Sequence, residues 1–405
     1  MPPLRAHRGE RPGTLKGATL LAQNQTTRNP QPLFYASPET STDLLYFGGF
    51  LAPDPFLAFE SGKQRVAVLN ALEYARALKE SRFDTVLSLE EWREKARRRY
   101  GTSSKAVKLA QIVRLLWQEF SIHQFVVPHD FPAGLAFELK RAKVPFTVSS
   151  DELFPQRAIK TTDEVKELRE ANNAAAAGIR TAEQLLRRAT IGKGDQLFYQ
   201  RKMLTSERLR EAIAVACLIA GGSAPEPIAA GGEQACDPHA KGTGPLYANQ
   251  LIIVDVFPRI TRTGYYGDMT RTFLKGRASE AQRKLVAVVR QAQEQALTQM
   301  KIGCSTARIH ASVVKFFNSR GYHTKCKDGI SQGFFHSTGH GIGLDIHEAP
   351  RVGPNGGRLR KGMVITVEPG LYYSNIGGVR IEDVVHVTTE GPKKLSDFHY
   401  QWEIA

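Results

Sequence analysis

Two aspartates in a strand-forming hairpin constrain this chain more than any other feature. The β-branched run Leu251–Val256 predicts a strand, and Tyr265–Phe273 predicts the strand that returns after a turn. Each carries one acid, Asp255 or Asp268. A carboxylate in an apolar strand costs free energy unless a partner neutralises it, and two on paired strands also repel each other. A cation held between them would resolve both problems, although two aspartates facing water at a turn would give the same local pattern.

A second hairpin repeats this arrangement later in the chain. Met363–Glu368 and Gly377–Val385 predict paired strands that carry Glu368 and Glu382. These two acids are 14 positions apart, and the two aspartates are 13 apart. A helix pair joined through Ile-Gly precedes each hairpin, with helical patterns expected over 164–189 and 196–219, then over 280–300 and 306–319. The repeat predicts two similar units facing each other across a pseudo-two-fold axis, with four acids converging on one cavity.

Four converging carboxylates cannot all stay ionised without compensating charge. One divalent ion would leave net negative charge, whereas two would cancel it. Hard oxygen ligands with a single imidazole suit manganese, cobalt, iron or zinc better than a thiolate site would. We therefore expect a site for two metal ions, which would activate a water and stabilise the oxyanion of a transition state.

The glycine-rich segment Ser337–Pro350 supplies the expected imidazole. Glycines around His340 let the backbone approach a ligand closely, so His340 is the expected nitrogen ligand. His347 is seven residues further on and is better placed to hydrogen-bond a substrate carbonyl or oxyanion. His239 follows a loop-forming stretch before the first hairpin and could also contact substrate. The alternatives are a structural histidine at 340 and an exposed loop histidine at 239.

The amino-terminal part predicts a separate α/β domain over residues 33–155. Expected strands at 44–51, 56–59, 65–69, 124–128 and 145–149 alternate with expected helices at 72–79, 89–99, 106–120 and 132–143. Such alternation favours a mainly parallel sheet. Residues 1–32 are expected to form a mobile basic arm, and a catalytic domain is expected over 160–405 after a boundary near 151–162.

Composition excludes several classes of function. The net charge of +15 is spread over both halves, and the basic run at 93–99 is more typical of a solvated helix face than of a nucleic-acid patch. No apolar run approaches the roughly 20 residues of a membrane span, and the first residues lack a secretory pattern. The four cysteines show no pairing pattern, which fits a reducing cytoplasm. We therefore expect neither a nucleic-acid nor a membrane partner.

The acids and histidine together resemble a known ligand set. Asp255, Asp268, His340, Glu368 and Glu382 resemble, in order, the five metal ligands of the pita-bread metallopeptidases. Three further motifs are similar to the Xaa-Pro peptidase branch, aminopeptidase P and prolidase: Gly339–Gly343 with His347-Glu348, Glu368–Gly370, and Arg380–Asp383. The resemblance implies an α+β pita-bread (creatinase/aminopeptidase) catalytic domain with an internal pseudo-two-fold duplication, preceded by a smaller α/β domain like the creatinase/prolidase amino-terminal domain.

The resemblance also implies a role for each ligand. Asp255 and Glu368 would each bind mainly one metal ion, Asp268 and Glu382 would bridge both, and His340 would complete one coordination shell. The cofactor would be two divalent ions, with Mn²⁺ expected first and Co²⁺, Zn²⁺ or Fe²⁺ as alternatives. Glu368 is also the expected carrier of a proton to the leaving nitrogen.

Other residues would handle the substrate or support the metal shell. His239 and His347 would hold substrate near the scissile bond, Arg380 would lie close to the metals, and Thr270 would support their shell. Gln234 departs from the asparagine that relatives often carry, which puts substrate contacts of that loop in doubt.

The expected function is a metallopeptidase that cleaves between an amino-terminal residue and a following proline by a metal-activated hydroxide. Its substrates would be proline-containing peptides, and the resemblance implies a homodimer. Two alternatives remain at this point: a non-enzymatic pita-bread binding protein, and another dinuclear hydrolase such as a methionine aminopeptidase. The large amino-terminal domain disfavours methionine aminopeptidase, and the intact acid set disfavours both a non-enzymatic protein and a creatinase-like hydrolase. A dipeptidase and an aminopeptidase acting on longer peptides are not distinguished.

Overall fold

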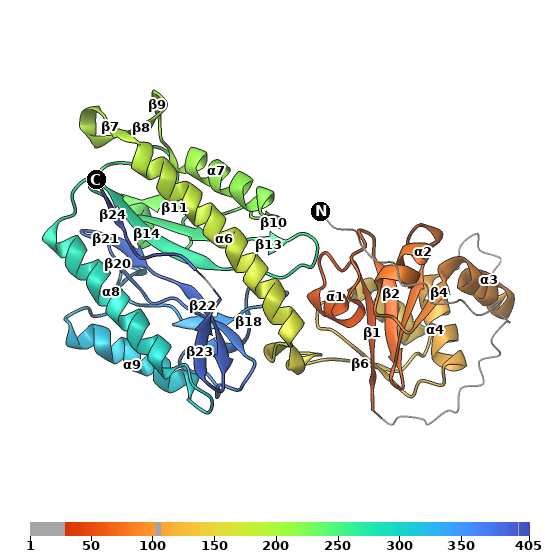
Figure 1. Cartoon of the computed structure of the whole chain (residues 1–405). Coiled ribbons are helices and arrows are strands. Elements are labelled where there is room, and N and C mark those ends of the chain that lie inside the picture. The colour runs from red at the N-terminus through yellow and green to blue at the C-terminus, as the bar shows by residue number, and fades with distance from the viewer. Residues whose placement is uncertain (1–28, 102–106, 396) are drawn as a thin grey trace, which may run out of the picture. The chain divides into compact units, whose positions relative to one another are not determined.

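The structure, a computed structural model, describes residues 29–101, 107–395 and 397–405. It forms two compact units: one runs up to Pro38 and continues over Phe47–Asp151, and the other comprises Glu39–Tyr46 and Glu152–Ala405 (Figure 1). Up to residue 28, the expected basic arm lies outside the described residues. No helix in the described ranges combines the length and the apolar character that crossing a bilayer requires.

The first unit is built on a six-stranded mixed sheet in the order β4-β3-β2-β1-β5-β6. Three neighbouring pairs are parallel, whereas β1–β2 and β2–β3 are antiparallel. The strands are β1 Gln31–Ala36, β2 Phe56–Ser61, β3 Gln64–Leu69, β4 Thr85–Ser88, β5 Phe125–Val127 and β6 Phe146–Val148. The helices of this unit are α2 Ala71–Glu80, α3 Leu89–Tyr100, α4 Leu109–Glu119 and α5 Ala133–Arg141.

The strand expected over 44–51 is wrong, because helix α1, Thr42–Gly48, occupies most of that stretch. Leu44, Leu45 and Phe47 are all buried, and the Ser41 hydroxyl accepts a hydrogen bond from the backbone N–H of Leu44 at the start of the helix. A short apolar run has the same pattern in a buried helix and in a buried strand, so periodicity alone could not separate them.

The first half of the second unit consists of a helix pair and a four-stranded sheet. Helices α6, Thr162–Arg188, and α7, Ser206–Ile219, pack against strands β11, β12 and β14. The sheet order is β11-β12-β14-β24, with bounds Ile228–Gly231, Ile252–Val256, Met269–Lys275 and Glu403–Ile404. The helical region expected over 196–219 is correct only from Ser206, because β7 Thr190–Ile191, β8 Leu197–Tyr199 and β9 Lys202–Met203 form a small sheet before it.

The second half repeats the plan with helices α8, Glu280–Gln299, and α9, Thr306–Ser319. Its sheet has the order β18-β17-β19-β22-β23, with bounds Glu348–Val352, Gly339–Gly341, Val364–Val367, Asp383–Thr388 and Gly391–Lys394. The single strand expected over 377–385 is in fact two strands. β21, Gly377–Arg380, pairs with β20, Gly370–Tyr373, whereas β22 pairs with β19. Two small ladders complete the unit: β10 Gly222–Ser223 with β13 Arg259–Ile260, and β15 Lys325–Lys327 with β16 Ile330–Gln332.

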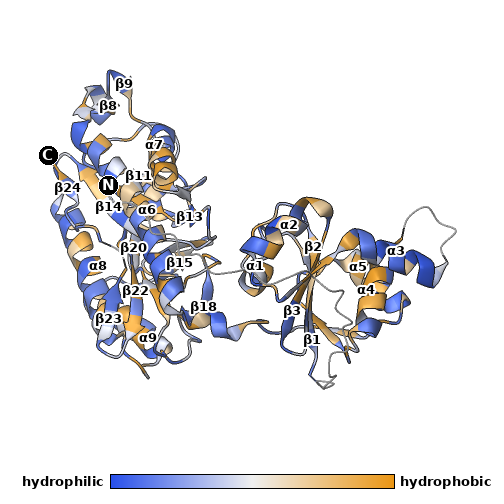
Figure 2. Ribbon diagram, turned by 45° about the vertical axis from the view of Figure 1, so that its right-hand side comes forward, coloured by the Kyte–Doolittle hydropathy of each residue, from blue (hydrophilic) through white to orange (hydrophobic). Residues whose placement is uncertain are grey.

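The two halves bury their cores in the same way. Ile179 of α6 and Ile213 of α7 belong to one buried cluster with Val254 of β12, and the second half has a corresponding cluster between α8, α9 and β19. Figure 2 shows helices such as α8 striped in hydrophilic and hydrophobic colours, as expected where one face covers a sheet. The duplication predicted from the sequence is consistent with this arrangement.

Candidate metal centre

The four acids lie in or beside the central strands of the two sheets. Asp255 lies in β12 opposite Thr270 of β14, and Asp268 directly precedes β14. Glu368 directly follows β19 and Glu382 directly precedes β22, at the end where these strands pair. Each half therefore supplies two acids from neighbouring antiparallel strands.

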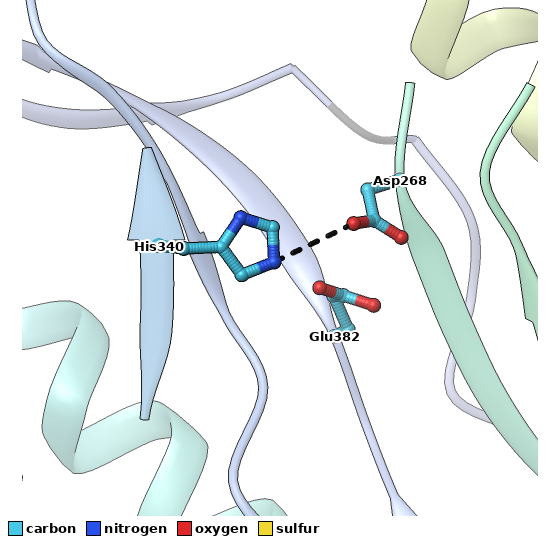
Figure 3. A group of neighbouring side chains, drawn as sticks. All are labelled: Asp268, His340 and Glu382. Carbon is cyan, nitrogen blue, oxygen red and sulfur yellow. Dashed lines mark ion pairs between the residues drawn. The ribbon is translucent and has the colours of Figure 1, made fainter. Parts of the chain in front are cut away.

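Three of the predicted ligands converge closely. One ligand atom from each of Asp268, His340 and Glu382 lies within 4.8 Å of the others, and all three residues are buried (Figure 3). His340 Nε2 is 3.8 Å from Asp268 Oδ2 and 3.4 Å from Glu368 Oε1. The structure thus brings both halves of the unit together at one point.

Two glycines allow the histidine strand β17 to approach its neighbours. A Cβ on Gly339 would lie 1.9 Å from the carbonyl oxygen of Thr366, and one on Gly341 would lie 2.2 Å from that of Ala349. The Thr366 hydroxyl accepts the backbone N–H of His340 at 3.1 Å and donates to Glu368 Oε1 at 3.3 Å. Larger residues at 339 or 341 would push His340 away from the acids.

The hydrogen bonds of His340 fix its neutral tautomer. Its Nδ1 lies 3.1 Å from the carbonyl oxygen of Gly341, which can only accept, so Nδ1 carries the proton. The lone pair of Nε2 therefore faces the carboxylates of Asp268 and Glu368. Burial lowers the pKa of His340 to about 3, so the ring stays neutral at physiological pH. A lone pair pointing at carboxylates is repulsive unless a cation lies between them.

Unpaired oxygen atoms fit the same cation site. Among the described residues, Asp255 Oδ1 and Glu382 Oε1 are buried without a hydrogen-bond partner. Buried polar atoms normally have partners, and an orphaned acceptor beside other acids indicates a place for a cation. Four hard carboxylates with one imidazole are a donor set suited to divalent metals. The residues present therefore fit the expected metal ions.

Without a cation, the crowded acids hold protons. Burial raises the pKa of Asp268 well above its usual value, and the charges of Glu382 and Asp255 raise it further. Burial and the charges of Glu368 and Asp255 do the same to Glu382. Burial raises the pKa of Glu368 to about 7, although the positive charge of Arg380 opposes the shift. Metal binding must therefore displace protons from this cluster.

Arg380 lies in a chain of hydrogen bonds that ends on Asp255. Its Nη2 donates to Asp255 Oδ2 at 2.7 Å, and its Nη1 donates to the Tyr372 hydroxyl oxygen at 3.0 Å. The Tyr372 hydroxyl in turn lies 2.9 Å from His336 Nε2. His336 Nδ1 lies 2.8 Å from the Ser337 carbonyl oxygen, so Nδ1 carries the proton and Nε2 accepts from Tyr372.

Sequence reasoning missed His336 and Tyr372. A signal was available for His336, which lies four residues before His340 and directly precedes the glycine-rich segment. Tyr372 had none, because a tyrosine in a strand is usually a packing residue. Burial raises the pKa of Tyr372 to about 12, so it remains a hydroxyl that both donates and accepts.

The two expected substrate histidines are exposed and lie near the acids. The rings of His347 and His340 pack edge to face with centroids 4.4 Å apart. His239 is exposed on the loop after β11. The pKa of His347 is lowered by burial first, with smaller contributions from the positive charges of Arg351 and His239. The ring contact with His340 therefore places His347 at the border of the centre.

The residues expected to support the site have defined partners. The Thr270 hydroxyl donates to Glu382 Oε2 at 2.8 Å. The amide of Gln234 donates to the carbonyl oxygen of Thr243 at 3.0 Å and accepts the backbone N–H of Thr243 at 2.8 Å. Gln234 therefore closes the loop that carries His239, through hydrogen bonds that a glutamine side-chain amide can make.

Four neighbouring carboxylates, three of them buried, and one buried imidazole on a duplicated sheet fold form a candidate metal site. The profile of metallopeptidase family M24 matches residues 166–389, more than half of the chain. The chain therefore belongs to metallopeptidase family M24.

Individual relatives agree with this assignment. An Xaa-Pro dipeptidase of Pyrococcus horikoshii is 30% identical over 279 residues, which are 67% of this chain and 72% of the relative. The Xaa-Pro dipeptidase of Pyrococcus furiosus is 31% identical over 267 residues, or 64% and 69% of the two chains.

Solved structures share the fold of the chain. The Xaa-Pro dipeptidase from Bacillus anthracis has a TM-score of 0.76 at 23% identity, covering 93% of this chain and 95% of its own. The X-Pro aminopeptidase from Thermotoga maritima has a TM-score of 0.76 at 20% identity, covering 93% and 97%. These comparisons confirm the predicted pita-bread fold, the resemblance to the Xaa-Pro peptidase branch and the expectation of an enzyme.

Proposed function

We propose that the protein hydrolyses the bond between an amino-terminal residue and a following proline, with two divalent metal ions as cofactor. The observation that carries the proposal is the convergence of the His340 lone pair with carboxylates that include orphaned oxygen atoms. The substrate class rests on the relatives named Xaa-Pro dipeptidases at 30% and 31% identity. Those names favour this activity over that of a methionine aminopeptidase.

The metal ions would be held by Asp255, Asp268, His340, Glu368 and Glu382. The family resemblance implies that Asp268 and Glu382 would contact both ions, and both side chains are buried in the cluster. When bound, divalent ions lower the pKa of a water and polarise the substrate carbonyl. Manganese is our first candidate among the metals.

Glu368 is the proposed proton carrier. The nitrogen of any cleaved peptide bond must gain a proton as it leaves. Glu368 is the candidate because its carboxylate lies inside the cluster, with Oε1 3.4 Å from His340 Nε2. His239 and His347 are the proposed donors to the substrate carbonyl oxygen, and Arg380 holds the Asp255 carboxylate in place.

The test compares peptides with and without proline. Protein loaded with Mn²⁺ is incubated with an Xaa-Pro dipeptide, an Xaa-Pro-Yaa tripeptide and the matching alanine peptides. We expect cleavage only of the proline peptides, and no cleavage by Glu382→Ala. Equal cleavage of the alanine peptides, or none of any peptide at a range of metal concentrations, would refute the proposal. The ratio of dipeptide to tripeptide cleavage separates a dipeptidase from an aminopeptidase. The homodimer and the cytoplasmic location remain predictions.

A further inference from the structure

A buried ion cluster lies directly beside the candidate metal centre. At its middle is Glu348, whose Oε1 is 2.5 Å from Arg157 Nη2 and whose Oε2 is 2.5 Å from Lys160 Nζ. Arg157 also pairs with Asp345 and Asp43, each at 2.7 Å. We call these five residues the Glu348 cluster. Its two cations come from the segment before α6, far from the glycine-rich segment in sequence.

Glu348 also closes the loop that carries His347. Its Oε1 accepts the backbone N–H of Leu344 at 3.0 Å and that of Asp345 at 3.2 Å. One side chain therefore ties the start of the loop to its end, and His347 lies between the two tied points. A Cβ on Gly343 would lie 2.5 Å from Glu348 Oε2, so this closure requires the glycine.

The burial of the cluster indicates a role in geometry. The side chains of Lys160, Glu348 and Arg157 are only 2%, 6% and 12% exposed. Burial acts to raise the pKa of Glu348, but the charges of Lys160 and Arg157 outweigh it and lower the pKa. A buried ion pair adds little net stability compared with apolar residues of the same volume, because its desolvation offsets its attraction. What it does provide is a fixed orientation for the groups it joins.

His347 is the group that gains from a fixed orientation. His347 is exposed near the end of this loop. It directly precedes Glu348, whose carboxylate pairs with both Lys160 and Arg157. Within the described ranges the His347 side chain has no hydrogen bond, and its ring packs edge to face against His340. The position of its imidazole therefore depends on the backbone of the loop.

We propose that Glu348, held by Lys160 and Arg157, is a positioning residue that fixes the loop of His347 relative to His340. The proposal rests on the peptidase function proposed above. Glu348 acts through His347 and does not touch substrate. Lys160 and Arg157 would contribute to the same positioning. Without them, the Glu348 carboxylate could turn toward solvent and lose its hydrogen bonds to the backbone N–H groups of Leu344 and Asp345.

The test is a double-mutant cycle on Xaa-Pro cleavage with Glu348→Gln and His347→Ala. Glutamine keeps the shape of the side chain but removes the carboxylate that Lys160 and Arg157 share, while Arg157 keeps its pairs with Asp345 and Asp43. We expect Glu348→Gln to lower kcat about 10-fold in the wild-type background and less than about 2-fold in the His347→Ala background, since a lost oxyanion donor typically costs about 10²–10³. Bound metal, measured by elemental analysis, should be unchanged.

A matched control uses another buried glutamate in an ion pair. Glu183 of α6 is 5% exposed and pairs with Arg187 of the same helix at 2.6 Å and with His399 at 3.0 Å. Glu183→Gln should keep the wild-type kcat. Equal losses from Glu348→Gln in both backgrounds, or an unchanged kcat, would overturn the proposal. If Glu348→Gln does not fold, Arg157→Lys, which keeps the charge but loses the fork, takes its place.

Hydrogen exchange tests the loop-closing role of Glu348 independently of the proposed peptidase activity. The amides of Leu344 and Asp345 should exchange faster in Glu348→Gln than in wild type, while amides of α6 should not change. If wild-type protein cleaves no Xaa-Pro peptide, the proposed function fails, and faster exchange still supports the loop-closing role of Glu348. Unchanged exchange at 344 and 345 overturns it.

Discussion

Backbone carbonyls decide which nitrogen of each buried histidine is free to act. The carbonyl oxygens of Gly341 and Ser337 accept hydrogen bonds from the Nδ1–H groups of His340 and His336. In both rings, Nε2 is left as an acceptor, facing acids in one case and Tyr372 in the other. The site is thus prepared for a cation by hydrogen bonds that involve no charged group.

The first prediction concerns the two proposed bridging acids. Asp268→Ala or Glu382→Ala should abolish both metal binding and Xaa-Pro cleavage, because each removes an oxygen from the point where the two halves meet. Titration calorimetry with Mn²⁺ and a peptide assay measure the two effects. Glu390→Ala, at an exposed glutamate paired with Lys393, should change neither. Full activity in either bridging variant would contradict the assignment.

The second prediction concerns the pH dependence of stability at His336. Burial lowers the pKa of His336 to about 3, with a smaller contribution from Arg380, so the folded protein keeps it neutral while the unfolded chain protonates near pH 6.5. Its contribution to stability is therefore complete above pH 6.5 and is lost as the pH falls toward 3. Between pH 7.5 and 5.0, the free energy of unfolding of the wild type should fall by about 1–2 kcal/mol more than that of His336→Gln.

Urea denaturation at both pH values, with matched metal content, measures this difference. Comparing the two proteins cancels the titration of the acid cluster. The exposed His123 provides the control, and His123→Gln should follow wild type. If the free energies of unfolding of wild type and His336→Gln change in parallel with pH, His336 is not held neutral in the folded protein.

The positions of the charged site residues could be predicted from the sequence, whereas their hydrogen-bonded partners could not. Acids in apolar strands and a histidine among glycines break local rules, which makes them visible. His336, Tyr372 and the Glu348 cluster break none. Lys160 and Glu348 are 188 positions apart and meet only through tertiary structure. No sequence spacing could therefore predict their contact.

At the scale of elements, strands β14 and β22 are fastened together behind the metal centre. The Arg271 guanidinium donates to the carbonyl oxygens of Thr270 and Glu382 and pairs with Asp383 at 2.9 Å. It also donates to the carbonyl oxygens of Phe398 and His399 in the carboxy-terminal segment. One buried side chain thus joins the ligand-bearing strands of both halves.

The third prediction follows from this buried pair. Arg271→Met should destabilise the protein by about 3–5 kcal/mol, because it leaves the carboxylate of Asp383, itself only 1% exposed, without its guanidinium. Urea unfolding measures the change. Arg283→Met is the matched control: its pair with Glu403 is largely exposed, so its loss should destabilise the protein far less. Equal effects of the two substitutions would show that burial is not the deciding factor.

Element types were predictable where a pattern was long, and failed where it was short. The capped helices α6 and α8 were expected close to their observed bounds, because a capping box and many turns agree. Helix α1 was mistaken for a strand over a stretch of a few residues. The small hairpin β20–β21 was missed because Gly370–Arg380 gives no sign that its strands pair with each other before β22 returns to β19.

At the scale of the second unit, the metal centre lies where two independently built halves meet. Asp255 and Asp268 come from the half covered by α6 and α7, whereas His340, Glu368 and Glu382 come from the half covered by α8 and α9. Each half alone offers an incomplete ligand set with unneutralised acids. A bound cation would therefore join the halves as well as serve the reaction.

The fourth prediction is that metal stabilises the folded protein through this junction. Free Mn²⁺ at about 100 times its dissociation constant should raise the free energy of unfolding by about 2.7 kcal/mol, because only the folded state assembles the ligands. Scanning calorimetry with and without metal measures the rise in Tm. Glu382→Ala should show no rise, and a rise of the same size in that variant would place the stabilising ion elsewhere.

The division of the ligands between two halves also has a consequence during synthesis. A nascent chain leaves the ribosome from its amino terminus, and domains tend to fold as units once they are complete. The first hairpin emerges more than a hundred residues before Glu382. Until that last acid has emerged, the growing polypeptide can hold no complete ligand set.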